Sequence, residues 1–181
     1  MNTATANLEN DHIHILRLID VMEQITKRQE ADVAHLEMIV DLIRNFSDGL
    51  HHAKEEKLLF PKMVEKGYSF QQGPVAVMMH DHVQGRNFVK EIVDNISLYK
   101  TGNKDAVNGI YKNMQGYVDL LRAHITKENN ILFRMADNVL SNEEQILLLE
   151  QFKKVESNPI CGVVVADCIA QIYLLSKVYC A

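Results

Sequence analysis

The sequence has few of the residues on which β-structure and disulfide frameworks depend. Its 181 residues include only 8 glycines, 3 prolines and 3 cysteines, and no tryptophan. No segment alternates β-branched and polar residues as a half-buried strand does. The cysteines Cys161, Cys168 and Cys180 are odd in number, and their spacing matches no zinc or redox motif. We therefore expect an all-α protein in which Cys161 and Cys168 pack as small apolar residues.

Charge and hydropathy exclude two classes of partner. A net charge of −5 and a pI near 5.9 provide no basic surface for nucleic acid. No apolar run approaches the length that crosses a bilayer, and the polar N-terminus does not resemble a signal peptide. The sequence predicts a cytoplasmic protein with no nucleic-acid and no membrane partner.

Apolar residues recur every three or four positions through most of the chain, which predicts amphipathic helices. These cover about residues 8–28, 33–66 with a distortion at Pro61, and 74–100, and a fourth runs through 114–135. Ser141 and Glu144 have the spacing of a capping box, so a fifth helix follows and ends before Asn158, and a short helix covers about 163–179. Short links make neighbouring helices antiparallel. The predicted fold is an all-α, up-down-up-down four-helix bundle with one or two extra C-terminal helices, divided into a domain of residues 1–157 and a helical extension of residues 158–181.

One stretch of the sequence is repeated. Residues 51–60 recur as residues 124–133 with histidine, lysine, glutamate, leucine and phenylalanine at the same offsets. Each copy carries a histidine and a glutamate four residues apart, which lie on one face of an α-helix, one turn apart. The pair at 11–12, Asp-His, is mirrored at 81–82. The pattern indicates an internal duplication in which each two-helix unit contributes one histidine and then one His-x-x-x-Glu pair.

The repeated histidines and glutamates are predicted to bind metal because they lie on or beside the apolar stripes of the helices. Burying an ionised carboxylate without a partner is strongly unfavourable. Lys54 and Lys127 each precede a glutamate by one residue, so on an α-helix they point about 100° away from it. A single arginine, Arg86, cannot balance two carboxylates and four imidazoles. The predicted metal ligands are His12, His51, Glu55, His82, His124 and Glu128.

A lone histidine on an apolar face is more often a hydrogen-bonded residue than a ligand. His52 also stands four residues before a glutamate, Glu56, but the corresponding positions of the second copy are Ile125 and Asn129. The duplication therefore favours the first histidine of the pair. The histidines interpreted as structural are His14, His35, His52 and His80.

The predicted ligand set constrains the metal. Four imidazoles and two carboxylates without a thiolate suit Fe, Mn or Zn. Two glutamates from opposite helices can bridge two ions and leave open positions, whereas a structural zinc site is closed. We expect two non-haem iron ions, with Zn or Mn as alternatives, and a small ligand such as O2, NO or peroxide.

These motifs resemble those of the hemerythrin-like, or HHE cation-binding, family over about residues 8–140. The specific parts are the Asp-His pairs, where the family usually has Glu-His, the two His-x-x-x-Glu copies with the Leu-Phe that follows each, and Gly73-Pro74 ahead of His82 and Gly85-Arg86. The resemblance implies a four-helix bundle with an oxo- or carboxylate-bridged di-iron site. It makes terminal ligands of His12, His51, His82 and His124, and bridges of Glu55 and Glu128.

The sequence departs from the family at Met78. Oxygen-carrying members have a fifth histidine there, one helical turn before the histidine of the third helix. A site with four histidines leaves one iron with an extra open or water-filled position, which weakens a pure oxygen-carrier interpretation. Tyr111, Tyr117 and Glu9 are the candidates to fill it.

The sequence favours a di-iron protein that senses, scavenges or stores O2, NO or peroxide, and a sensor of this kind needs a protein partner. One alternative is an enzyme that reduces peroxide or NO, or an iron donor or store for iron–sulfur repair, as in some relatives. Another is a metal store or a structural bundle without metal. No general base or nucleophile stands apart from the predicted ligands, so no catalytic residue is assigned.

Overall fold

The computed structural model describes residues 3–30, 32–157 and 164–180, and all regular structure in these ranges is helical. This confirms the predicted all-α class. Cys161, expected to pack in the core, and the predicted boundary between residues 157 and 158 involve residues outside these ranges. None of the described helices is both long and apolar enough to cross a bilayer. The cytoplasmic location stays a prediction.

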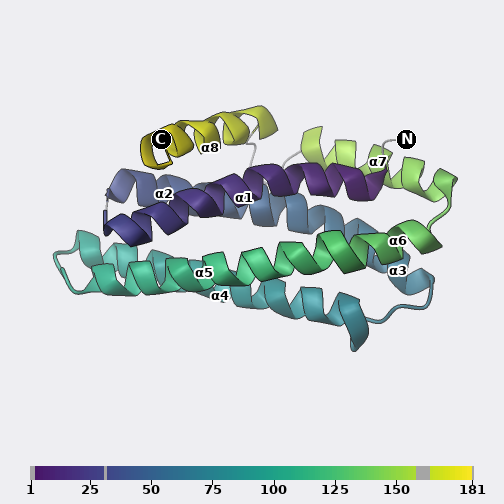
Figure 1. The fold of residues 1–181 in the computed structure, drawn as a ribbon, viewed down its shortest axis with the longest axis horizontal. Helices are drawn as coiled ribbons and strands as arrows, with labels where there is room; N and C mark the ends of the chain where they lie inside the picture. Colours follow the sequence, from purple (N-terminus) through teal and green to yellow (C-terminus); the bar gives the residue numbers. More distant parts are fainter. Residues whose placement is uncertain (1–2, 31, 158–163, 181) are drawn as a thin grey trace.

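Four long helical rods form the body of the protein, and successive rods run in opposite directions (Figure 1). The elements are α1 (Ala4–Arg28), α2 (Val33–Leu42), η1 (Ile43–His52), η2 (Glu55–Leu59), α3 (Phe60–Glu65), α4 (Gly73–Lys100), α5 (Ala106–Lys127), η3 (Glu128–Leu132), α6 (Phe133–Val139), α7 (Asn142–Ser157) and α8 (Val165–Tyr179). The first rod is α1, and the second runs from α2 through the π-helical segments η1 and η2 to α3. The third rod is α4, and the fourth runs from α5 through the π-helical segment η3 to α6. Two further helices, α7 and α8, lie against the first rod.

Local side-chain caps define where several helices begin. The Thr3 hydroxyl accepts a hydrogen bond from a backbone N–H of the first turn of α1, and Asp32 does the same for α2. The predicted capping box is confirmed, because the Glu144 carboxylate accepts from the Ser141 N–H at 2.9 Å while the Glu144 N–H donates to the Ser141 hydroxyl at 3.3 Å. The first rod ends at Gln29, which adopts a left-handed conformation with φ of 54°.

The second rod differs from the regular helix that we expected. Its irregularity does not begin at Pro61, which sits in the first turn of α3, where a missing N–H is tolerated. The winding instead widens to π-helix in η1 and η2, ahead of the proline. The same change occurs in the fourth rod, where η3 begins at Glu128, the counterpart of Glu55 at the start of η2. Short π-helical turns inside α-helices occur frequently at functional sites.

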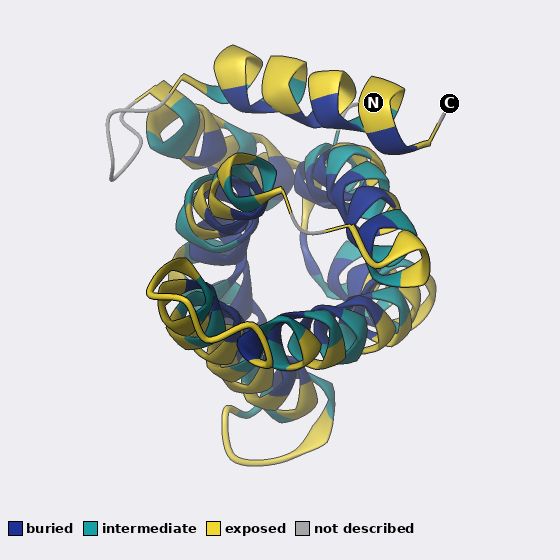
Figure 2. Ribbon diagram, turned by 90° about the vertical axis from the view of Figure 1, so that its left-hand side faces the viewer, coloured by how far each residue is buried: buried dark blue, intermediate teal, exposed yellow. Residues whose placement is uncertain are grey.

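The rods turn their buried faces inward (Figure 2). Two apolar clusters fill the interior, a larger one that includes residues of α2 and α8 and a smaller one that includes residues of α3, α6 and α7. Cys168 is buried in the larger cluster, as expected for a small packing residue, and Cys180 is exposed. Polar residues buried on the rods include the repeated histidines and glutamates.

Candidate metal centre

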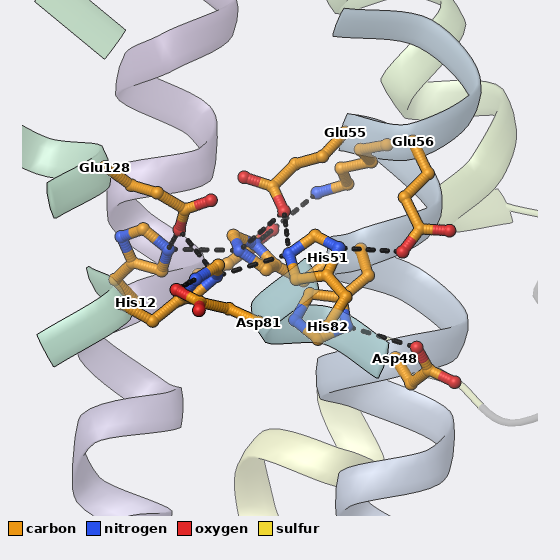
Figure 3. Close-up of polar contacts among 12 residues, drawn as sticks. His12, Asp48, His51, Glu55, Glu56, Asp81, His82 and Glu128 are labelled. Atoms are coloured by element: carbon orange, nitrogen blue, oxygen red, sulfur yellow. Dashed lines mark hydrogen bonds and ion pairs between the residues drawn. The ribbon is translucent and has the colours of Figure 1, made fainter. Parts of the chain in front are cut away.

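The structure brings all six predicted ligands together inside the bundle. His12 comes from α1, His51 and Glu55 from the second rod, His82 from α4, and the remaining two residues, His124 and Glu128, from the end of α5 and the start of η3. Each is at most 2 % exposed. Their side chains converge from the four rods, and Figure 3 shows most of them.

The converging side chains form two groups, each of four residues whose ligand atoms lie within 4.8 Å of one another. Glu55 belongs to both groups, so its carboxylate is positioned to serve two ions. This spacing allows each group to hold a metal ion. The first group is His12, His51, Glu55 and Glu128, and the second is His52, Glu55, His82 and His124.

Each glutamate reaches one histidine of each group. Glu55 Oε2 lies 3.6 Å from His51 Nε2 and 3.4 Å from His82 Nε2. Glu128 Oε2 lies 3.3 Å from Nε2 of His12 and 3.2 Å from Nε2 of His124. Each carboxylate therefore lies near histidines of both groups, although only Glu55 belongs to both.

Both carboxylates lack hydrogen-bond partners. Both oxygens of Glu55 and both oxygens of Glu128 are buried, and none accepts a hydrogen bond of good geometry. Burial, and next the charge of Glu128, raise the pKa of Glu55 well above its ordinary value. Two such carboxylates are not both ionised unless a positive charge lies between them, so this pair of side chains fits a cation.

Burial favours the neutral form of two of the predicted ligands, His51 and His82. Burial, followed by the charges of neighbouring histidines and Lys54, lowers the pKa of His51 well below its ordinary value. Burial also lowers the pKa of His82, despite its hydrogen bond to Glu56. Neutral imidazoles at pH 7 have a free ring nitrogen for a metal ion.

The outer partners of the histidines repeat between the two halves of the chain. Asp11 Oδ2 lies 3.3 Å from His51 Nδ1, and Asp81 Oδ2 lies 3.3 Å from His124 Nδ1. His12 Nδ1 lies 2.7 Å from Asn129 Oδ1, and His82 Nδ1 lies 2.7 Å from Glu56 Oε1. Metal-bound histidines almost always use the second ring nitrogen in this way, which fixes the orientation of the ring.

The repeated lysines pair with the aspartates, not with the glutamates that follow them. Lys54 Nζ lies 2.9 Å from Asp11 Oδ2 and 2.7 Å from Glu156 Oε1 of α7. Lys127 forms the corresponding ion pair with Asp81 at 2.5 Å. The expectation that neither lysine would balance its neighbouring glutamate holds. Arg86 binds Asp48 and Glu56, outside the two groups.

The structure also places His52, which the sequence pattern assigns a structural role, in the second group. The residue is 4 % exposed and its ring stacks on His82 with ring centroids 3.8 Å apart. The sequence pattern assumes α-helical winding, in which consecutive residues point about 100° apart. Residues 51 and 52 end the π-helical segment η1, whose wider turn reduces the angle between neighbours. The sequence signals for His52 were the doubled histidine and its four-residue spacing from Glu56.

Of the candidates for the position left by Met78, Glu9 does not join either group. Glu9 forms an ion pair with Arg134 at the surface, and Met78 itself is buried in the smaller apolar cluster. The candidate glutamate and the other three histidines interpreted as structural lie outside both groups: Glu9, His14, His35 and His80.

Comparison with known proteins gives a family match over residues 3–136, to the hemerythrin HHE cation binding domain. The iron-sulfur cluster repair protein YtfE of Musicola paradisiaca is 38 % identical over 93 residues, which are 48 % of this chain and 40 % of the relative. YtfE of Edwardsiella ictaluri is 31 % identical over 101 residues, 54 % of this chain and 44 % of the relative. An uncharacterized protein of Mycobacterium tuberculosis is 22 % identical over 158 residues, 85 % of this chain and 61 % of the relative.

The chain thus spans less than half of the length of the two repair proteins. No solved structure matches the chain significantly. The family match covers most of the sequence and includes every one of the six predicted ligands. The chain belongs to the hemerythrin HHE cation-binding family.

Proposed function

We propose that this protein is a four-helix bundle that holds two iron ions between its rods and binds O2, NO or peroxide there. The predicted ligands supply four imidazoles and two carboxylates, and His12, His51, His82 and His124 are the terminal ones. Glu55 and Glu128 are the bridges. The observation that supports this most directly is the placement of each carboxylate between histidines of the two groups.

Iron is favoured over the alternatives by the donor atoms and by the relatives. The two groups contain imidazole nitrogen and carboxylate oxygen and no sulfur, a set that also suits Mn or Zn. The similarity to iron-sulfur cluster repair proteins favours iron among these metals. When bound, two iron ions supply redox chemistry and open positions for a small ligand.

The surrounding residues keep such a site dry and rigid. Phe133 stacks on His12 with ring centroids 5.5 Å apart, and Phe60 stacks on His82 at 5.9 Å. The apolar clusters lie to either side along the bundle. These aromatic and apolar residues limit the contact of such a site with bulk water.

The experiment is a ligand titration of the iron-loaded protein. The reduced protein is exposed separately to air, NO and peroxide, and the visible spectrum is followed over repeated cycles of removal and addition. Bands that appear with one of these ligands and disappear reversibly when it is removed support binding. A spectrum that does not respond to any of the three ligands contradicts the proposal.

A second candidate function is iron donation in iron–sulfur cluster repair, which the similarity to the two YtfE proteins favours. The chain matches less than half of those relatives, so their activity is a hypothesis for this protein. Transfer of iron from the loaded protein to an apo iron–sulfur protein, faster than from the same concentration of free iron, would support it. The absence of any transfer would leave ligand binding as the function.

A further inference from the structure

The duplication relates many features of the two halves of the centre, from the aspartates Asp11 and Asp81 to the stacked Phe60 and Phe133. Among the residues of the two groups, His52 breaks this relation, since the offset that carries His52 in the first copy carries Ile125 in the second. Both side chains are buried, at 4 % and 3 % exposure. Only the first can bind a metal.

His52 has the same kind of hydrogen-bond partner at Nδ1 as three of the predicted ligands, a carboxylate. Its Nδ1 lies 3.1 Å from Asp48 Oδ1, and Asp48 is fixed in turn by Arg86, whose Nε and Nη2 donate to it at 2.9 and 2.6 Å. Its Nε2 is buried and has no hydrogen-bond partner. A histidine with one nitrogen bound to a carboxylate and the other buried and unpartnered has the arrangement typical of a metal ligand.

The histidines outside the centre lack this arrangement. His35 Nδ1 lies 2.7 Å from the Tyr179 hydroxyl, and His80 is exposed and interacts with Gln84. His14 has a buried Nδ1 without a partner, and its ring packs against Phe46 and belongs to neither group. Among the described histidines, the combination of an outer carboxylate and an inward, unpartnered Nε2 therefore separates His52 from these three.

We propose that His52 is a fifth histidine ligand of the centre, supplied by the second rod in place of the histidine missing at Met78. The inference rests on the proposed two-iron site. It makes the two metal positions unequal, because three imidazoles (His52, His82 and His124) serve one position and two (His12 and His51) serve the other. The small ligand then binds at the position with two imidazoles, on the side where His12 stacks on Phe133.

A rival role for His52 follows from a pocket at its outer side. A cavity of about 130 Å³ reaches this residue from the surface, and Asp48, Gly85, Arg86 and Tyr117 also line it. In this role His52 is the inner wall of an entry path and not a ligand. The two roles differ in whether removal of the imidazole changes the affinity for iron and the spectrum of the bound iron.

The test compares three proteins loaded with iron. The wild type is compared with His52→Ile, which copies the residue at the equivalent position of the second copy, and with His80→Ala, a control at an exposed histidine. Metal content, iron affinity by competition with a chelator, and Mössbauer spectra are measured, together with the circular dichroism of each apo protein to establish that it is folded. Because His52→Ile places an apolar side chain at a buried position, the apo fold is expected to persist.

The wild-type protein is expected to hold two iron ions in two different environments in equal amounts. His52→Ile should weaken iron binding by at least the roughly 10- to 100-fold that loss of an outer-shell partner costs, and should make the two environments alike. His80→Ala should match the wild type in metal content, affinity and spectrum.

Two results would overturn the proposal. One is a His52→Ile protein with unchanged affinity and two unequal environments, whether or not ligands then enter faster through the pocket. The other is a wild-type protein whose two iron ions are equivalent. A wild-type protein that binds no iron would instead refute the proposed two-iron site, so the two failures are distinguishable.

Discussion

The duplicated lysines allow one prediction with an internal control. Lys54 is completely buried and binds Asp11 and Glu156, whereas Lys127, at the same offset of the second copy, is 38 % exposed and binds Asp81. Replacing Lys54 with Met keeps most of the side-chain volume but leaves Asp11 buried with no cation beside it, where burial already raises the pKa of its carboxyl. In Lys127→Met, water can take the place of the lost ammonium group beside Asp81.

The expected losses differ severalfold. Breaking a buried ion pair by removing one partner costs about 3–5 kcal/mol, and removing one partner of a pair open to solvent costs about 0.2–1 kcal/mol. For a domain of this size, 1 kcal/mol corresponds to about 2–4 °C in Tm, so Lys54→Met should lower Tm by about 6–20 °C. Urea unfolding of both metal-free variants measures the difference in the free energy of unfolding.

The double variant Asp11→Asn, Lys54→Met separates lost charge pairing from lost packing. It should recover part of the stability lost in Lys54→Met, because the amide carries no charge that needs a partner. Losses for Lys54→Met and Lys127→Met within about 1 kcal/mol of each other, or a double variant no more stable than Lys54→Met, would refute this reasoning.

Three further predictions follow from packing, capping and metal binding. Gly116→Ala places a methyl group 2.4 Å from the Phe88 ring and should lower the free energy of unfolding by about 1–3 kcal/mol. In Gly85→Ala the nearest neighbour of the new methyl group would be 3.6 Å away, so the loss should be smaller. Thermal unfolding of both variants measures the difference. Ser141→Ala removes the hydroxyl that accepts from the Glu144 N–H and should cost about 0.5–2 kcal/mol by urea unfolding, and a loss below this range would mean that the capping box does not stabilise α7. Metal at about 100 times its dissociation constant should stabilise the protein by about 2.7 kcal/mol over the apo form, and an unchanged Tm on addition of a chelator would show that no metal stabilises the fold.

The helices were predictable because their apolar spacing is regular and the links between them are short. The capping box at Ser141 and the start of α4 near Pro74 were both visible as local signals. The π-helical segments were not, because the apolar pattern continues through them without an obvious break. A small change in winding alters which side chains face inward, and pattern analysis on an α-helical template does not detect it.

The convergence of the candidate residues was predictable where the duplication applies. The duplication singled out His51, Glu55, His124 and Glu128, and the structure brings these four residues together. The same comparison argued against His52, whose counterpart is Ile125, although the structure places His52 in the second group. Comparison of the two copies identifies the residues that they share. A residue present in only one copy, such as His52, is recognised only from the three-dimensional structure.

The complete burial of Lys54 also required the structure. The sequence showed that this side chain points away from Glu55, but a lysine pointing away from a core is ordinarily solvated. Here α7 supplies Glu156 and closes over the ammonium group. The docking of a helix almost one hundred residues later in the chain is a tertiary contact that local patterns do not encode.

The most direct test of the account is the number of iron ions that the purified protein binds per chain after anaerobic reconstitution, compared with the same number for Glu55→Gln and Glu128→Gln. Because each carboxylate lies between the two groups of histidines, we expect two iron ions in the wild-type protein and fewer than two in each variant. One iron or none in a folded wild-type protein, or two in both variants, would contradict a two-iron centre bridged by these glutamates.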